Sequence, residues 1–176
     1  MKQRGLQRVR LIVSDKSTGI LDAIGDFFSE SRWQRCVVHF YRNVLNAVPT
    51  GKSKVVSTML KAIHTQEDKE TARQKTEQVT VKLKALRLDK AARIVEAGAK
   101  ETFSFYDFPS NHWRHICTNN PLERLNREIR RRIRVVWSFP DGHSVLMLVE
   151  ARLRYLAGKK WGIERYLNMK TFGELG

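Results

Sequence analysis

The first forty residues alternate between strand and helix patterns, and this order constrains the fold more than any other feature of the chain. Val9–Ser14 is a short apolar, β-branched run that predicts a strand ending at Asp15. Apolar residues at helical spacing predict a helix over about Thr18–Ser29, and Trp33–Val38 predicts a second strand. A strand–helix–strand unit of this length favours parallel pairing through a right-handed crossover. The fold class predicted is therefore α/β, or α+β.

Residues 51–100 carry helical patterns throughout. Apolar and small side chains recur at helical spacing in three stretches: Val55, Val56, Met59, Leu60 and Ile63; Ala72, Thr76, Val79, Leu83 and Leu86; and Ala91, Ala92 and Val95 before a stop at Gly98. Thr65 followed by Asp68 indicates an N-terminal cap. Mixed charges along this segment are typical of a solvated helical surface.

Two long helices are predicted near the C-terminus. Asn120 matches a helix cap with Pro121 in the first turn. The stripe expected to be buried on this helix is Leu122, Leu125, Ile129, Ile133 and Val136. After a turn at Phe139–Gly142, apolar residues from Val145 to Leu156 predict the last long helix, which ends at Gly158.

Composition points to a globular chain in a reducing compartment. The 176 residues are 41% hydrophobic, enough to form a core. The longest apolar runs are too short to span a bilayer, and Leu11–Val13 is too short for a signal peptide. Cys36 and Cys117 do not make a disulfide scaffold. We therefore expect a cytoplasmic protein.

The charge indicates a polyanionic partner. The chain holds 33 Lys and Arg against 18 Asp and Glu, a net charge of +15 with His neutral. Six arginines and a single acid, Glu128, lie between positions 124 and 134. Arginine forks suit phosphate groups, so DNA is the expected partner of this helix. The candidate DNA-binding residues are Arg124, Arg127, Arg130, Arg131, Arg132 and Arg134.

Two carboxylates are candidate metal ligands. Asp15 directly follows the first predicted strand, where open α/β sheets place their sites, although it also suits a turn or a helix cap. Glu123 lies three residues after Asn120, as a capping-box glutamate does. It also shares a helix face with Asn126, Arg127 and Arg130, an arrangement like a metal ligand beside a phosphate clamp.

Cys36 and His39 allow two other chemistries. Together with His112 and His115 they have the residue types of a zinc site, but the spacing between the two pairs is unconstrained. Cys36 with His39 as base also suggests a thiol nucleophile, although no third orienting group is evident. A plainer interpretation places Cys36 as a small buried residue on a strand and His39 as a polar residue at its end.

Several strings of residues, in this order, resemble the C-terminal part of the Mutator-type bacterial insertion-sequence transposases. The most specific are Trp33-Gln34-Arg35-Cys36 with His39, and Thr118-Asn119-Asn120-Pro121-Leu122-Glu123 with the arginines that follow. Val13-Ser14-Asp15, Phe108-Pro109 with His112-Trp113-Arg114, and Phe139-Pro140 with Ser144 extend the match over nearly the whole chain.

The resemblance implies a partial ribonuclease-H-like core with an all-helical insertion. It divides the chain into residues 1–50 and 111–176 of the core, and residues 51–110 of the insertion. The family uses three acids, Asp-Asp-Glu, to hold two Mg²⁺ or Mn²⁺ ions, and Asp15 and Glu123 match the second and third. Cys36 and His39 match a signature near the active site. DNA cleavage and strand transfer, a bacterial nucleoid location and multimer assembly of the full-length protein are implied as well.

The family's first aspartate has no counterpart before Asp15. We therefore expect a truncated catalytic domain with little or no strand transfer by this chain alone. Two alternatives remain open: a non-enzymatic, basic nucleic-acid-binding protein that uses the helix at Arg124–Arg134, and a small zinc-stabilised module.

Overall fold

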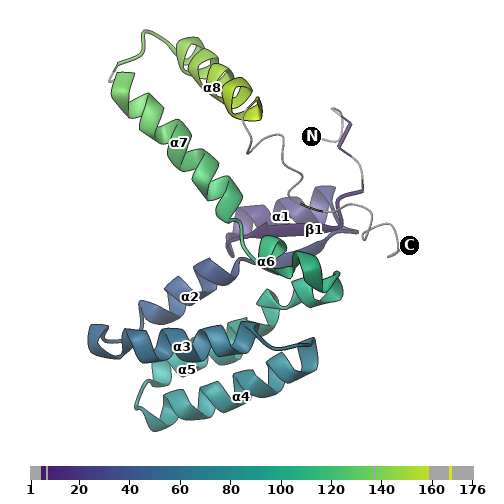
Figure 1. The fold of residues 1–176 in the computed structure, drawn as a ribbon, viewed down its shortest axis with the longest axis vertical. Coiled ribbons are helices and arrows are strands. Elements are labelled where there is room, and N and C mark those ends of the chain that lie inside the picture. Colours follow the sequence, from purple (N-terminus) through teal and green to yellow (C-terminus); the bar gives the residue numbers. More distant parts are fainter. Residues whose placement is uncertain (1–4, 7, 137, 159–166, 168–176) are drawn as a thin grey trace. The chain divides into compact units, whose positions relative to one another are not determined.

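The computed structural model describes residues 5–6, 8–136, 138–158 and 167, and it forms two compact units (Figure 1). The first unit ends at Thr118 and the second begins at Asn119. Each unit is described by itself below.

A strand–helix–strand segment opens the first unit, as predicted. Strand β1 (Leu11–Ser14) and strand β2 (Arg32–Arg35) are joined by helix α1 (Thr18–Phe27). The strands pair in parallel, in a register that runs from Leu11 opposite Arg32 to Ser14 opposite Arg35. The carboxyl ends of both strands therefore meet at the same edge, just before Asp15.

The second strand is shorter than the predicted Trp33–Val38. Helix α2 (Val37–Leu45) begins immediately after β2, and the Cys36 carbonyl accepts a hydrogen bond from the Phe40 N–H at 3.0 Å. Val37 and Val38 thus belong to the helix. An amphipathic pattern that buries Phe40 and Val44 outweighs the β-branched run at this point.

The segment from residue 51 to residue 100 is helical, as predicted. It contains α3 (Ser53–His64), α4 (Lys69–Ala85) and α5 (Asp89–Gly98), which lie side by side beneath α2 (Figure 1). Asp68 caps α4 by accepting the Thr71 N–H at 2.7 Å. The four helices share one core, whose fully buried members include Phe40, Val44, Val56, Leu60, Ile63, Leu83 and Val95.

The ribonuclease-H-like α/β core expected from the resemblance is wrong for this structure. Among the described residues the sheet has two strands of four residues each, and the structure is mostly helical. The physical reason is visible in the core, whose buried apolar side chains come almost entirely from helices that pack on one another. None of the described helices is long and apolar enough to cross a membrane.

Short helical turns connect this body back to the sheet. Four follow α5 or precede the second unit: the 3₁₀ turns Ala99–Thr102, Ser104–Asp107 and Ser110–His112, and the one-turn helix α6 (Trp113–Ile116). A further 3₁₀ turn, Thr50–Lys52, precedes α3. Phe103 and Phe105, from the aromatic patch of the sequence, are buried here.

The second unit is a helical hairpin. Helix α7 (Asn120–Val136) and helix α8 (Gly142–Ala157) match the predicted helices, and α8 folds back beside α7 (Figure 1). The Asn119 carbonyl accepts the Glu123 N–H at 3.1 Å, so the cap is Asn119 rather than Asn120. The predicted buried stripe is only partly buried: Leu125, Ile129 and Ile133 are half-buried, Leu122 and Val136 are exposed, and neither helix contains a fully buried residue.

His64 joins three parts of the first unit's core. Its Nδ1 lies 3.0 Å from the Tyr41 hydroxyl on α2, and its Nε2 lies 2.7 Å from the Thr102 hydroxyl. Its ring makes an edge contact with Phe103, with centroids 5.7 Å apart. Burial disfavours the imidazolium and lowers the pKa of His64 from 6.5 to about 4. The same burial raises the pKa of Tyr41.

This pKa predicts a loss of stability in mild acid. The folded pKa of about 4 lies below the ordinary 6.5, so between these values the unfolded chain binds a proton that the folded chain does not. The free energy of unfolding is therefore expected to fall as the pH drops from 6.5 to 4, by up to about 1.4 kcal/mol per pH unit from this group. Urea unfolding of wild type and His64→Gln across this range measures the effect. Parallel pH profiles for the two proteins would contradict it.

Candidate functional site

Asp15 lies at the carboxyl end of β1, where the sequence placed it. Its side chain is exposed, and its carboxylate makes no hydrogen bond or ion pair with any residue that the structure describes. The helix-cap interpretation finds no support, because Ser17 occupies the cap position of α1 and no side chain caps that helix. Asp15 is thus a carboxylate at a strand end with its charge uncompensated by described neighbours.

Both neighbours of Asp15 are anchored to other elements. The Ser14 hydroxyl donates to the Asp15 carbonyl at 2.8 Å and accepts the Trp33 indole N–H at 2.9 Å. Lys16 forms an ion pair with Glu101 in the turn after α5. Side chains on either side therefore hold the backbone of Asp15 in place, while its own carboxylate is left for other partners.

Arg35 ties β2 to the same carboxylate of Glu101. Its Nη1 donates to Glu101 Oε2 at 3.2 Å, and its side chain is 9% exposed. The guanidinium lies 5.4 Å from the centroid of the Phe40 ring, in cation–π geometry. It also passes over Gly98, where an added Cβ would lie 2.7 Å from Nη1. Gly98 is thus the residue that leaves space for Arg35 at the end of α5.

Gln34 bonds β2 to two of the segments that follow α5. Its side chain is completely buried, its Oε1 accepts the Phe105 N–H at 2.5 Å, and its Nε2 donates to the Ile116 carbonyl at 3.2 Å. Cys36, also completely buried, donates its backbone N–H to the Ser14 carbonyl at 2.7 Å. The Trp33–Cys36 string therefore has a structural role: it joins the sheet to the helical body.

The two alternatives built on Cys36 gain no support. A completely buried thiol does not reach a phosphate group, which argues against nucleophilic chemistry at Cys36. His39 is partly buried on α2, and His112 is buried beside α6. In the part of the chain that the structure describes, no group of three or more His, Cys, Asp and Glu is placed to hold a metal ion.

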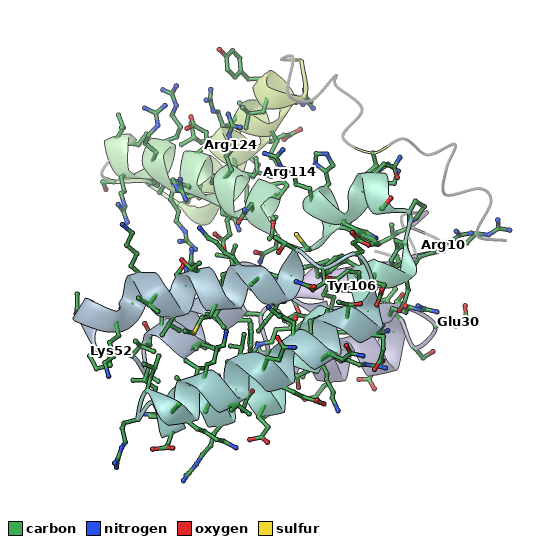
Figure 2. All side chains as sticks on the ribbon, turned by 60° about the horizontal axis from the view of Figure 1, so that its bottom comes forward. Arg10, Glu30, Lys52, Tyr106, Arg114 and Arg124 are labelled. Carbon is green, nitrogen blue, oxygen red and sulfur yellow. The ribbon has the colours of Figure 1, made fainter. Side chains whose placement is uncertain are left out.

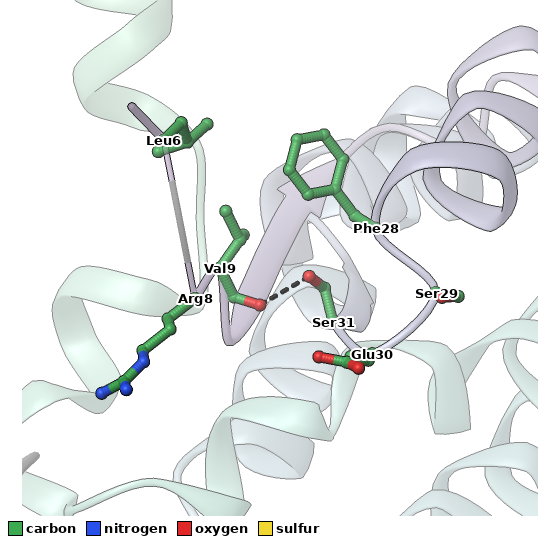
Figure 3. A pocket seen from close by; sticks show the side chains of 7 residues that line it. All are labelled: Leu6, Arg8, Val9, Phe28, Ser29, Glu30 and Ser31. Atoms are coloured by element: carbon green, nitrogen blue, oxygen red, sulfur yellow. Dashed lines mark hydrogen bonds between the residues drawn. The ribbon is translucent and has the colours of Figure 1, made fainter. Parts of the chain in front are cut away.

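A hollow in the first unit lies at the opposite end of the strands from Asp15. It is lined by residues that precede or connect the strands, namely Leu6, Arg8, Val9, Phe28, Ser29, Glu30 and Ser31 (Figure 3). The Ser31 hydroxyl donates to the Val9 carbonyl across it at 2.5 Å. Because the strands are parallel, their amino ends meet here, and this hollow is separate from the Asp15 end of the sheet.

The charged and apolar residues of helix α7 are divided among three faces. Glu123, Arg127, Arg130 and Arg134 follow one another at intervals of four, three and four residues, so they share one face. Arg124, Glu128 and Arg131 share a second, and the apolar residues occupy the third. Arg127, Arg130 and Arg134 are exposed, whereas Arg131 and Arg132 pair with Glu128. Figure 2 labels Arg124 on this helix.

The chemistry of Asp15 and Glu123 fits a hard divalent cation. Mg²⁺ and Mn²⁺ prefer carboxylate oxygens and keep several waters, and Asp15 offers an exposed carboxylate without a described counter-ion. Glu123 is partly buried in the first turn of α7. These two residues lie in different units, and neither belongs to a group of three or more possible metal ligands among the residues that the structure describes.

The residues that sequence reasoning missed are Glu101 and Gly98. Glu101 gave no signal because it lies in a helical stretch rich in mixed charges, and its partners Lys16 and Arg35 are 85 and 66 residues away in sequence. The sequence predicts a helix stop at Gly98, and α5 does end there. Because Gly98 has no side chain, the Arg35 guanidinium can also pack closely against it.

Comparison with known proteins gives a consistent result. Residues 1–161 match the family model described as "Transposase, Mutator family". A transposase for insertion sequence element ISRM5 from Rhizobium meliloti (strain 1021) is 37% identical over 175 residues, which cover 99% of this chain and 44% of that protein. These matches agree with the resemblance identified from the sequence.

Two further relatives are similar over most of the chain. A transposase for IS1081 from Mycobacterium tuberculosis (strain ATCC 25618 / H37Rv) is 39% identical, covering 96% of this chain and 40% of that protein. A transposase for IS256 in transposon Tn4001 from Staphylococcus aureus is 33% identical, covering 87% of this chain and 39% of that protein. The chain thus spans less than half the length of these relatives.

The packing of Arg35 over Gly98 predicts opposite effects for two glycine substitutions. Gly98→Ala should lower the free energy of unfolding by about 1–3 kcal/mol, because the new Cβ displaces a buried, ion-paired guanidinium. Gly25→Ala in α1 meets no atom within 4 Å and should raise it by up to about 1 kcal/mol through helix propensity. Urea denaturation measures both. If Gly98→Ala also stabilised the protein, the close packing of Arg35 on α5 would be disproved.

Proposed function

Because the chain belongs to the Mutator family of transposases, we propose that it is a DNA-processing region of an insertion-sequence transposase. In this proposal it takes part in cleavage and joining of DNA phosphodiesters, with Asp15 and Glu123 as metal ligands and the arginines of α7 as phosphate-binding residues. The observation that carries the proposal is α7 itself, which places Glu123 on the same face as Arg127, Arg130 and Arg134.

The roles of the chain's own groups follow from their chemistry. Arginine guanidinium groups hold backbone phosphates and position the duplex without reading its sequence. The carboxylates of Asp15 and Glu123 would hold divalent cations, which would supply stabilisation of the charge that develops on the oxygens around phosphorus. The anchoring of Ser14 and Lys16 keeps the backbone of Asp15 at the strand end before any ligand binds.

DNA binding is expected to depend strongly on salt. About three phosphate contacts, one for each of the exposed residues Arg127, Arg130 and Arg134, predict a slope near −2.7 for the logarithm of the binding constant against that of the salt concentration. Affinity for a duplex should then fall roughly fortyfold between 50 and 200 mM salt. Fluorescence anisotropy with the 176-residue chain and two duplexes of unrelated sequence measures this. Affinity that is independent of salt would contradict phosphate binding.

Metal binding is tested separately from DNA. We expect Mn²⁺ to broaden the amide NMR signals around Asp15 and around Glu123, because a paramagnetic ion relaxes nearby nuclei. Asp15→Asn should abolish the first effect and Glu123→Gln the second. Asp22→Asn, at another exposed acid of the same unit, serves as the control and should change neither.

Broadening that is equal around all exposed acids, or that survives both substitutions, would exclude Asp15 and Glu123 as specific ligands. Together with salt-dependent DNA binding, that outcome would favour the alternative of a non-enzymatic DNA-binding protein.

A further inference from the structure

Glu128 gathers arginines from both helices of the second unit. From α7, Arg131 donates Nε and Nη2 to the two carboxylate oxygens at 3.2 and 3.1 Å, and Arg132 Nε lies 3.6 Å from Oε1. From α8, Arg152 donates Nη2 to Oε1. These contacts hold the pKa of Glu128 at about 2, with the hydrogen bond from Arg131 as the largest cause. Glu128 is therefore ionised near neutral pH.

The contact with Arg152 is the part that joins the helices. The Arg152 side chain is 16% exposed, against 62% for Arg131 and 45% for Arg132. Its guanidinium lies 4.6 Å from the centroid of the Tyr155 ring on the next turn of α8. Neither α7 nor α8 has a fully buried apolar residue, and the pair of Arg152 with Glu128 is a direct polar contact between the two helices.

A separate row of arginines has no such partner. Arg127, Arg130 and Arg134 are exposed and make no ion pair with any residue in the described part of the chain. They lie on the face of α7 that carries Glu123. Seven residues of helix separate the first from the last, a span of about 10 Å. This length corresponds to about three nucleotide steps along the axis of a duplex.

We propose that Glu128 is a positioning residue that divides five of the six arginines of α7 into two groups. It holds Arg131 and Arg132 with Arg152 in a cluster that fixes α8 against α7, while Arg127, Arg130 and Arg134 bind phosphates of one DNA strand. This inference rests on the proposed DNA-binding function and deepens it, because it assigns the contacts to three residues and gives Arg131 and Arg132 a structural task.

The division follows from competition for the same donors. A phosphate that binds the Nε and Nη2 edge of Arg131 replaces charge-assisted hydrogen bonds to Glu128 that already exist, and one that binds Arg132 competes with the same carboxylate for the cation. Arg127, Arg130 and Arg134 give up only water. The cluster still carries net positive charge and attracts DNA at a distance, so its arginines contribute through the long-range field rather than through contact.

Two double substitutions that remove equal charge from the same helix test the division. We expect Arg127→Gln with Arg130→Gln to weaken duplex binding by about tenfold near 100 mM salt, and to reduce the salt slope by about 2. Arg131→Gln with Arg132→Gln should weaken binding by less than about threefold and reduce the slope by less than 1. Fluorescence anisotropy gives both quantities, and far-UV circular dichroism verifies that helix content is unchanged.

Hydrogen exchange, which needs no DNA, tests the role of Glu128. Glu128→Gln should accelerate amide exchange in α8, because a neutral amide holds Arg152 less strongly than a carboxylate does. Arg134→Gln, one of the residues assigned to DNA, should leave α8 exchange unchanged.

The outcomes separate the inference from the proposed function. If wild type binds DNA in a salt-dependent way but the two double variants lose affinity equally, the division of arginines is wrong and the proposed function stands. If wild type shows no salt-dependent binding, the proposed function fails and the phosphate assignments fail with it. Unchanged α8 exchange in Glu128→Gln would overturn the positioning role in either case.

Discussion

The buried polar side chains of β2 are the contacts on which the first unit depends. Gln34 and Arg35 lie on consecutive residues of a four-residue strand, and both are removed from water. Gln34 satisfies the backbone of Phe105 and Ile116, and Arg35 pairs with Glu101. A buried amide or guanidinium that lost such a partner would cost several kcal/mol, so these bonds fix where the sheet meets the helices. Arg35 Nε has no hydrogen-bond partner, which makes the guanidinium more dependent on Glu101.

This arrangement explains how so small a sheet holds the backbone of Asp15 in place. Two short strands are not stable alone, but β2 is bonded to the turns that follow α5, and these pack on the helical core. Ser14 and Lys16 are bonded to Trp33 and Glu101, so the backbone around Asp15 inherits the rigidity of that core. The helices of the first unit therefore support the backbone of Asp15, although none of the proposed metal ligands lies on them.

The second unit is built on a different balance of forces. Its helices bury little apolar surface, and charge pairs at Glu128 take a larger part in holding them together. Such pairs weaken in salt more than apolar packing does. In this proposal some arginines of α7 hold the two helices together and others bind DNA. The position of Glu128 determines which arginines belong to the first group. In the sequence, Glu128 stands out as a lone acid in a basic run, but its partner Arg152 lies 24 residues away and gave no signal.

The sequence predicted the order and type of the elements well, because amphipathic spacing and caps such as Asp68 act locally. It overextended β2, since the β-branched pair Val37 and Val38 also suits a helix that buries Phe40. It predicted a ribonuclease-H-like core that the described sheet does not form, and a buried stripe on α7 that is partly exposed. Long-range pairs such as Arg35 with Glu101 could not be predicted, because nothing in local spacing records them. The assignments of Asp15 and Glu123 as metal ligands stay predictions.

Helix α7 is the surface through which we propose that this chain meets DNA. Photocrosslinking of a bromouracil-substituted duplex to the 176-residue chain, followed by peptide mapping, tests it most directly. We expect crosslinks concentrated in residues 120–136 and sparse on α4 and α5, whose surfaces carry charges of both signs. Crosslinks that fall mainly on those two helices would contradict this assignment.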